Sequence, residues 1–348
     1  MARTSDRIKG GLKYAIGFGL LGFVVWKNWA PNEQTKSPGL SGLLNQSPDW
    51  LMLAAVAGCL VLAMSMQFAR WYVLVRAVDL PFTKFNALRL GLVGYFYSQF
   101  LPGSIAGDIV KAYFIVKEQP GRKAVAAATV VIDRLFGLFG LLLLASVCGG
   151  IAWATGDERV AGNAYLRKII IVSIAVVVAA IVGWIVLGIM PNRWLNAIEA
   201  KLHRLPKVGQ SLAEIFFAIR LYRNRPGSIY LCVQISAVSH VSMQLMLHAG
   251  TRAFPQLAVD AGTLAEHFVI GPIGFIAQVF FPAPGGVGGA EAIFGYLYTI
   301  IGRLETTGVV GRLTIRAAEY TLGMIGYLVY VRMKAELPTG PAPSERET

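Results

Sequence analysis

Long apolar runs recur along this chain, and three of them cover residues 124–153, 169–190 and 229–247. A helix needs about 20 consecutive, mostly apolar residues to cross the hydrocarbon core of a bilayer, and these runs reach or approach that length. Only 15% of the residues are charged, whereas soluble domains carry about 25%. The chain is therefore predicted to be an all-α, polytopic membrane helix bundle.

About six full spans are expected, and they cover residues 12–30, 50–75, 124–152, 168–190, 228–250 and 313–331. Two more apolar segments, 86–117 and 264–302, are interrupted near the middle by proline and glycine. Their arms of roughly 12 to 18 residues are too short for comfortable spans. Irregular backbone at membrane depth is tolerated only where protein or water covers it, so each segment is predicted to be a re-entrant, broken-helix hairpin.

The distribution of basic residues predicts which side of the membrane each loop faces. With a cytoplasmic N-terminus (residues 1–11), roughly two thirds of the 32 Lys and Arg residues fall in stretches predicted to be cytoplasmic. Both termini are then cytoplasmic, and the expected location is the inner cell membrane. The net charge of +13 follows from this bias and indicates no nucleic-acid partner. Counting each hairpin as two full spans preserves the same sidedness, so charge leaves that variant open.

Residues 12–332 are predicted to form one membrane domain with two distinctive flanking or linking segments. Residues 191–227 mix aromatic, leucine and basic residues around Pro206, which is typical of an interfacial amphipathic helix pair. Together with the span at 168–190, this segment is expected to link two halves of the domain. Residues 333–348 form a Pro-rich C-terminal tail that is expected to be disordered.

The two interruptions have nearly the same residue order. FLPGSIAGD at residues 100–108 and FFPAPGGVGGAE at residues 280–291 each contain proline, then glycines, then an acid. The predicted topology gives the surrounding halves, about 50–152 and 228–331, opposite orientations in the membrane. Inverted repeats that are interrupted by Gly and Pro at matching positions point to the central site of a transporter.

An arginine follows the acid at nearly the same distance in both halves. Asp108 precedes Arg134 by 26 residues, and Glu291 precedes Arg316 by 25 residues. An arginine inside a span costs about 2.5 to 3.5 kcal/mol on insertion scales, so each needs compensation. Arg316 has Glu319 at i+3 on the same helix face, whereas Arg134 has no such local partner. Arg134 is thus the stronger candidate for binding phosphate, because a guanidinium offers a fork of donors to phosphate oxygens.

The acids of the two motifs admit more than one role. Asp108 and Glu291 fall near the start of a half-helix, where a carboxylate caps free backbone N–H groups. Alternatively they hold a cation or proton, or pair with Arg134 and Arg316, and the sequence leaves these roles open. The glycines allow positive φ and close approach of another group, and half-helix N-termini favour an anion.

Other kinds of site find little support in the sequence. The three cysteines lie inside apolar runs and have neither metal-ligand nor disulfide spacing. His240 and His248 are interpreted as packed polar groups, and no histidine has cysteines or acids at metal-ligand spacing. No nucleophile–base constellation is specific enough to name. We therefore expect no catalytic residues, no metal and no cofactor, and Gln99, just before the first interruption, is a candidate ligand contact.

Three stretches, FLPGSIAGDIVKAYFIV, TVVIDRLFGL and FPAPGGVGGAEAIF, resemble the signatures of the lysylphosphatidylglycerol synthase transmembrane family, also called flippase-like integral membrane proteins. The resemblance covers residues 10–332 and implies a multi-pass bacterial or archaeal protein that handles a lipid. In two-domain members, this region moves an aminoacylated phospholipid between leaflets, and a cytosolic domain makes that lipid. This chain resembles the stand-alone membrane domain, so synthase activity is not expected.

The resemblance also transfers motif positions as candidate substrate-binding residues, and Asp133 is a further motif position. Lys111 stands where the family more often has arginine, and Ser104 where glycine is common, and we interpret both departures as mild. The candidate substrate-binding residues are Pro102, Gly103, Gly107, Asp108, Lys111, Arg134, Pro284, Gly285, Gly286, Gly288, Gly289, Glu291 and Arg316.

The leading hypothesis is a membrane lipid translocase whose substrate is a phospholipid or a polyprenyl phosphate. Arg134, Arg316 and the half-helix N-termini would hold its phosphate. No nucleotide-binding loop is present, so transport is expected to be downhill or coupled to ions or protons through Asp108, Glu291 or Glu319. The alternatives are an enzyme that transfers a group to or from a lipid-linked carrier, and a scaffold for a separate lipid synthase. Association with such a synthase or with further copies of the chain stays open.

Overall fold

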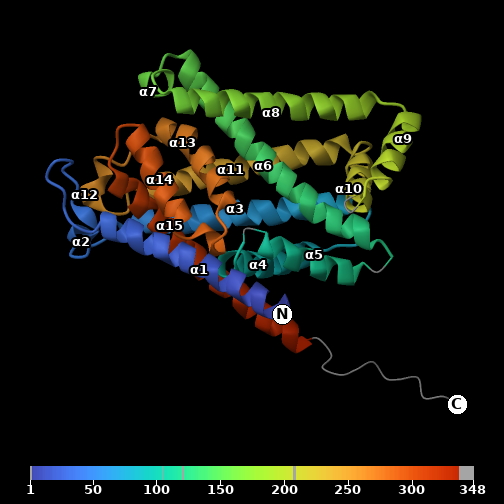
Figure 1. Ribbon diagram of the computed structural model, residues 1–348, viewed down its shortest axis with the longest axis horizontal. Helices are drawn as coiled ribbons and strands as arrows, with labels where there is room; N and C mark the ends of the chain where they lie inside the picture. Colours follow the sequence, from blue (N-terminus) through green and yellow to red (C-terminus); the bar gives the residue numbers. More distant parts are fainter. Residues whose placement is uncertain (1, 104, 120, 207–208, 337–348) are drawn as a thin grey trace.

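The computed structural model describes every residue except 1, 104, 120, 207–208 and 337–348. All regular elements of the described chain are helices, apart from one isolated bridge between Asn32 and Ser37. Most of the longer helices run along the long axis of the molecule or obliquely to it (Figure 1). The prediction of an all-α bundle is confirmed, while Ser104 and most of the predicted tail lie outside the described residues.

Several helices begin at a capping side chain, which accepts hydrogen bonds from free N–H groups of the first turn. Asp49, Thr83 and Asn163 cap α3, α4 and α8 in this way. The helices are α1 (Ala2–Lys27), α2 (Gly39–Leu43), α3 (Trp50–Ala77), α4 (Lys84–Phe100), α5 (Ala106–Glu118), α6 (Lys123–Ala154), α7 (Glu158–Ala161), α8 (Ala164–Ile189), α9 (Asn192–His203), α10 (Gly209–Tyr222), α11 (Pro226–Gly250), α12 (Pro255–Ala258), α13 (Leu264–Ala277), α14 (Gly289–Ile300) and α15 (Glu305–Glu336).

Four of these helices, α3, α6, α8 and α11, are long and apolar enough to cross a membrane. They cover four of the predicted spans. The other two predicted spans are also helical, in α1 and α15, but among the described residues these helices do not belong to that group. In α15 the reason is visible in the sequence, because Arg312, Arg316 and Glu319 interrupt its apolar residues.

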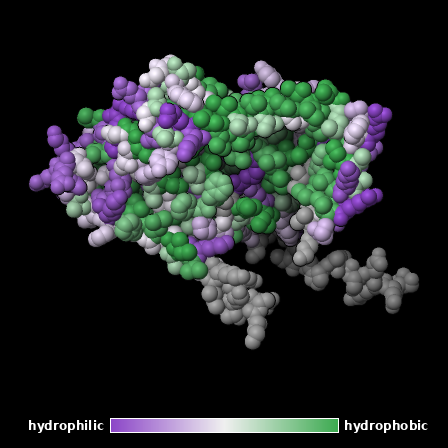
Figure 2. All heavy atoms as spheres, turned by 45° about the horizontal axis from the view of Figure 1, so that its top comes forward, coloured by the Kyte–Doolittle hydropathy of each residue, from purple (hydrophilic) through white to green (hydrophobic). Residues whose placement is uncertain are grey.

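The surface has the polarity expected of a membrane protein. Hydrophobic side chains dominate the middle of the face shown in Figure 2, and hydrophilic ones gather toward its two ends. The outermost helix, α8, presents Ile171, Val172, Ile185 and Ile189, which are between 50% and 76% exposed. Such a continuous apolar surface is unusual on a soluble monomer, and lipid tails would cover it without cost.

Both predicted interruptions separate two helices. The first lies between α4 and α5, where Gly103 has a φ of 98°. The second lies between α13 and α14 and contains two short 3-10 turns, η1 (Gln278–Phe280) and η2 (Pro284–Gly286). Gly285 and Gly288 have φ of 56° and 77° there. Backbone with positive φ favours glycine, since a Cβ atom would be strained.

Helices of similar length follow in the same order in the two halves. In the first half α3, α4, α5 and α6 have 28, 17, 13 and 32 residues. In the second half α11, α13, α14 and α15 have 25, 14, 12 and 32 residues. α3 packs along α11, α4 along α15, and α6 along α13. The helix that precedes each break therefore contacts the last helix of the other half.

The remaining helices lie at the periphery and at the two ends of the bundle (Figure 1). α8 packs against α6, and α9 packs against α10, which also contacts α6. The helices α9 and α10 lie in the basic segment where a helix pair was expected. At the opposite end, α2, α7 and α12 connect the long helices.

Candidate functional site

The acid and the arginine of each half form an ion pair. Arg134 Nε on α6 donates to Asp108 Oδ2 in the first turn of α5. Arg316 Nε on α15 donates to Glu291 Oε1 in the first turn of α14. The matched spacing in the sequence thus corresponds to matched contacts, and of the roles left open for the two acids, pairing with arginine is realised in both.

The two pairs differ in exposure. The side chains of Asp108 and Arg134 are 16% and 42% exposed, whereas those of Glu291 and Arg316 are 0% and 4% exposed. Glu291 Oε2 also accepts from the Gly288 backbone N–H at 2.7 Å, so this carboxylate both caps α14 and pairs with arginine. The second pair is enclosed by protein, while the first is open to its surroundings.

Arg316 holds the second break to α15. Its Nη1 donates to the Gly285 carbonyl oxygen at 3.1 Å. Glu319, which shares a helix face with Arg316, accepts from Arg312 Nη2 at 2.8 Å instead. The partner of Arg316 is therefore the distant Glu291 rather than its local neighbour, and Glu319 compensates a different arginine.

Asp133 points away from Arg134 and joins a separate buried cluster. Its Oδ1 accepts from Arg70 Nε at 2.8 Å, and its Oδ2 lies 3.5 Å from Lys111 Nζ. The Lys111 ammonium also lies 4.3 Å from the centre of the Trp71 ring, which adds a cation–π attraction. The motif residues Lys111 and Asp133 are thus buried partners of one another, with Arg70 as an additional cation.

A cavity of about 310 Å³ lies between the two breaks. Pro102 and Gly103 line it from the first break, and Phe280 and Pro282 line it from the second. Lys13 of α1 contributes a positive charge to its wall. The cavity brings the two motif loops together at one place, although they are about 180 residues apart in the sequence.

The remaining motif glycines permit close packing and do not line this cavity. A Cβ atom on Gly107 would lie 2.0 Å from the Gly94 carbonyl oxygen. On Gly288 it would lie 2.3 Å from the Gly17 carbonyl oxygen of α1, and on Gly289 2.0 Å from the Phe281 ring. Pro284 and Gly286 are buried. These positions require glycine or proline for the shape of the breaks, whatever else they do.

The other polar candidates, Gln99 and His240, are buried inside the helix bundle. Gln99 is buried at the end of α4, and a Cβ atom on Gly285 would lie 2.4 Å from its Oε1. His240 is buried in α11, and Gln244 Nε2 donates to its carbonyl oxygen at 3.2 Å. Among the described residues, no group of three or more His, Cys, Asp or Glu side chains is arranged to hold a metal.

The sequence model of a family described as "Lysylphosphatidylglycerol synthase TM region" matches residues 14–326. The chain belongs to this family. The matched residues include all three motifs, so the resemblance inferred from them is confirmed. As a transmembrane region of this kind, the chain is a membrane protein built from apolar helices.

Two curated relatives of this transmembrane region carry the description "UPF0104 membrane protein". The one from Methanothermobacter thermautotrophicus is 24% identical over 274 residues, which cover 75% of this chain and 78% of the relative. The one from Methanocaldococcus jannaschii is 21% identical over 306 residues, which cover 85% of this chain and 88% of the relative. No solved structure matches the chain significantly.

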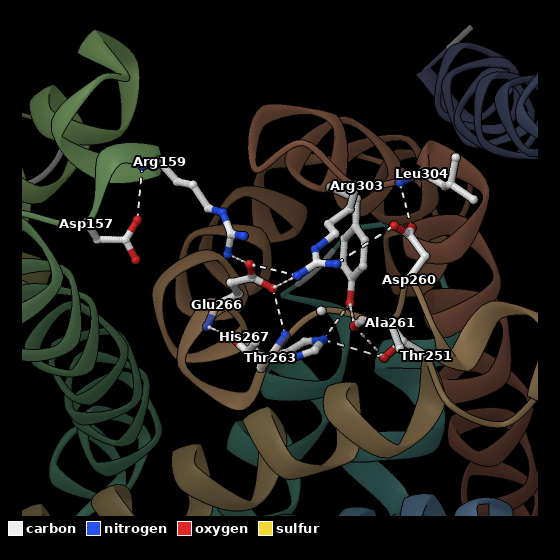
Figure 3. A network of polar contacts seen from close by, with 12 residues as sticks. Asp157, Arg159, Thr251, Asp260, Ala261, Thr263, Glu266, His267, Arg303 and Leu304 are labelled. Carbon is white, nitrogen blue, oxygen red and sulfur yellow. Dashed lines mark hydrogen bonds and ion pairs between the residues drawn. The ribbon is translucent and has the colours of Figure 1, made fainter. Parts of the chain in front are cut away.

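One polar network of this transmembrane region was not predicted from the sequence (Figure 3). Glu266, at the start of α13, pairs with Arg159 of α7 and accepts from Arg303 Nη2 at 3.2 Å. It also forms a capping box with Thr263, whose N–H lies 2.6 Å from Glu266 Oε2. The fully buried His267 follows on the same turn. The network links α7, the start of α13 and the turn between α14 and α15 at one end of the bundle.

Arg70 and Arg312 were also missed as site residues. Arg70 lies near the end of the predicted span 50–75 and was counted among the cytoplasmic basic residues, and Arg312 lies one residue before the predicted span 313–331. In the structure α3 continues to Ala77 and α15 already begins at Glu305, so both arginines are helical and buried. Their partners are other buried charges, and the cost of an unpaired buried charge was the available signal.

Proposed function

We propose that this protein is a lipid translocase that moves an anionic, phosphate-bearing lipid between the leaflets of the inner cell membrane. The substrate class is a phospholipid or a polyprenyl phosphate. In this proposal, residues 12–332 form one membrane domain whose halves are inverted repeats with re-entrant hairpins, and both termini are cytoplasmic. The family match supports a membrane role, and the two acid–arginine pairs support the transport mechanism.

The proposal rests on the difference in solvent exposure between the two equivalent acid–arginine pairs. Asp108–Arg134 is partly exposed, whereas Glu291–Arg316 is enclosed. A transporter built from two related halves opens its site to one side at a time. Equivalent residues in an open and a closed setting are what one state of such a cycle requires, and the opposite state would exchange their exposure.

The cavity between the breaks has the chemistry to receive a lipid headgroup. Lys13 offers a positive charge to a phosphate, and Ile105, Ile109 and Phe280 around it are 63%, 66% and 81% exposed. Lipid tails would remain against such apolar side chains while the headgroup enters the polar interior. A volume of about 310 Å³ matches the lower end of ligand pockets, which are about 300 to 1,000 Å³.

Protonation of a paired carboxylate offers a route to energy coupling. Each of the three coupling candidates has an arginine partner: Asp108 with Arg134, Glu291 with Arg316, and Glu319 with Arg312. A proton that neutralises such a carboxylate releases the guanidinium to bind phosphate. The lipid and the proton would then bind together. Deprotonation of the carboxylate would restore the ion pair and favour release of the lipid.

The test is transport by purified protein in vesicles that contain phosphatidylglycerol with a labelled headgroup. A membrane-impermeant quencher reports the initial rate at which label leaves the inner leaflet. The Arg134→Gln, Arg316→Gln double variant is expected to lose at least about tenfold in rate, since hydrogen bonds to charged groups contribute about 1.5–3 kcal/mol each. Lys168→Gln, on peripheral α8, is the matched control and should keep the wild-type rate.

A polyprenyl phosphate added as competitor distinguishes the two substrate classes, because the preferred lipid slows the movement of the other. Transport by the wild-type protein that never exceeds that of protein-free vesicles, with either lipid labelled, would overturn the proposal. So would equal rates for the double variant and the wild type. Appearance of a chemically altered lipid in the same vesicles would favour the enzyme alternative.

A further inference from the structure

A second group of buried polar atoms lies where the two halves meet, between α4 and α15. These helices approach closely because α15 contains glycines on the facing side. A Cβ atom on Gly326 would lie 2.3 Å from the Leu92 carbonyl oxygen, and one on Gly323 would lie 3.0 Å from the Phe100 ring. Since α4 belongs to the first half and α15 to the second, any rocking of the halves changes this interface.

Several polar side-chain atoms at this interface have no hydrogen-bond partner among the described residues. Arg312 is 1% exposed, and only its Nη2 is bonded, to Glu319 at 2.8 Å. Within the described part of the chain, Arg312 Nε and Nη1, Arg316 Nη2 and Gln99 Oε1 are buried without a hydrogen-bond partner. A buried polar atom without a partner costs about 1–3 kcal/mol, and more when the group is charged. A bound group that supplies the missing hydrogen bonds would remove this cost.

The position of the two guanidinium groups selects the kind of occupant. Arg312 and Arg316 are four residues apart on α15, so they share a face one turn from each other. Gln99 and Arg316 both lie against Gly285, whose Cβ atom would be 2.4 Å from Gln99 Oε1 and 3.3 Å from Arg316 Nη1. The unpaired groups are mostly N–H donors, and turning the Gln99 amide over would add another. An acceptor with several oxygens fits this arrangement.

Glu319 and Glu291 already offset the two arginines, so an anion gains from this site once one of these carboxylates is protonated and releases its guanidinium. A group that shares its negative charge among several oxygens gains most from fork-like donors. A phosphate group has this chemistry.

We propose that Arg312 and Arg316, with Gln99, form a buried site that holds the phosphate group of the transported lipid at the α4–α15 interface. This inference rests on the proposed function and assigns Arg312 as a third phosphate-binding arginine, besides Arg134 and Arg316. Gln99 lies three residues before Pro102, which lines the cavity between the breaks. The headgroup would pass from that cavity to the buried site as the halves move.

Native mass spectrometry with defined lipids tests the site directly. The probes are phosphatidylglycerol and diacylglycerol, which lacks the phosphate. Arg312→Gln is expected to weaken retention of phosphatidylglycerol about tenfold or more, equivalent to about 1.4 kcal/mol. Diacylglycerol retention should not change. Glu319→Gln removes the carboxylate that competes for Arg312, so it is expected to strengthen retention of phosphatidylglycerol.

The opposite signs of these two effects separate a binding role from a structural one. A purely structural Arg312–Glu319 pair would make both variants less stable and leave the lipid preference unchanged, which would overturn the inference. Arg312→Gln combined with Glu319→Gln removes both charges, keeps the interface neutral and should still lose phosphatidylglycerol. If the wild-type protein retains neither probe selectively, the proposed function fails. If it selects phosphatidylglycerol and all three variants do so equally, only this site fails, and its donors bind water.

Discussion

At the scale of single residues, the buried charges are organised as small groups of opposite sign. Glu291 and Glu319 each face one arginine, whereas Asp133 faces two cations, Arg70 and Lys111. All three side chains are at most 10% exposed. Removing the carboxylate would leave two cations in a space with little water, and breaking a buried pair in this way costs about 3–5 kcal/mol.

Asp133→Asn is therefore expected to destabilise the protein more than Asp108→Asn or Glu319→Gln does. Asp108→Asn is its control, because its partner Arg134 is 42% exposed and can be solvated after the change. Thermal unfolding in one detergent, with both variants and the wild type side by side, measures the difference. Equal losses of stability for the two variants would show that burial does not decide the strength of these pairs.

At the scale of helices, the two arms of each broken segment pack closely against each other because glycine, which has no side chain, lies at their contact. In the first segment, a Cβ atom on Gly107 of α5 would lie 2.0 Å from the Gly94 carbonyl oxygen and 2.1 Å from Ser98 Oγ of α4. Backbone atoms cannot give way as a flexible side chain can. Any larger residue at this position must separate the two arms and open the break.

Gly107→Ala is expected to destabilise the protein by about 1–3 kcal/mol, the usual cost of overpacking. Gly58→Ala on α3 is the matched control, because nothing lies within 4 Å of its added Cβ atom. Alanine is the better helix former by up to about 1 kcal/mol, so the control should be neutral or stabilising. Thermal unfolding of both variants checks the prediction, and a neutral Gly107→Ala would contradict the close packing of α4 and α5.

The helix scale also shows what the sequence could predict. The breaks were predictable, because proline and glycine inside apolar runs are local signals. Pairing of each acid with its arginine was one of several roles that the sequence left open, and Arg316 also had Glu319 as a local candidate. The contact of Asp133 with Arg70 joins residues 63 apart, and no local pattern indicates such a partner. Arg312 was assigned to a loop because the predicted span begins at residue 313, whereas α15 already begins at Glu305. The end of the bundle around Glu266 depends on contacts between several turns and was not predictable.

At the scale of the whole molecule, the two halves have complementary contacts. α4 packs on α15 and α13 packs on α6, so the broken segment of each half rests on the last helix of the other. A movement of one half relative to the other must change both interfaces at once. This coupling is what a transporter needs in order to close one side while it opens the other.

Opposite orientation of the halves predicts opposite accessibility for their connecting loops. Lys84, at the start of α4, should face the cytoplasm, and Val259, which is 92% exposed between α12 and α13, should face the exterior. Each is changed to cysteine after Cys59, Cys148 and Cys232 have been replaced. A membrane-impermeant maleimide added to intact cells should label Val259→Cys, and Lys84→Cys should react only after the cells are opened. Labelling of both from the same side would rule out inverted halves, because each full span between the two positions reverses the side that the next loop faces.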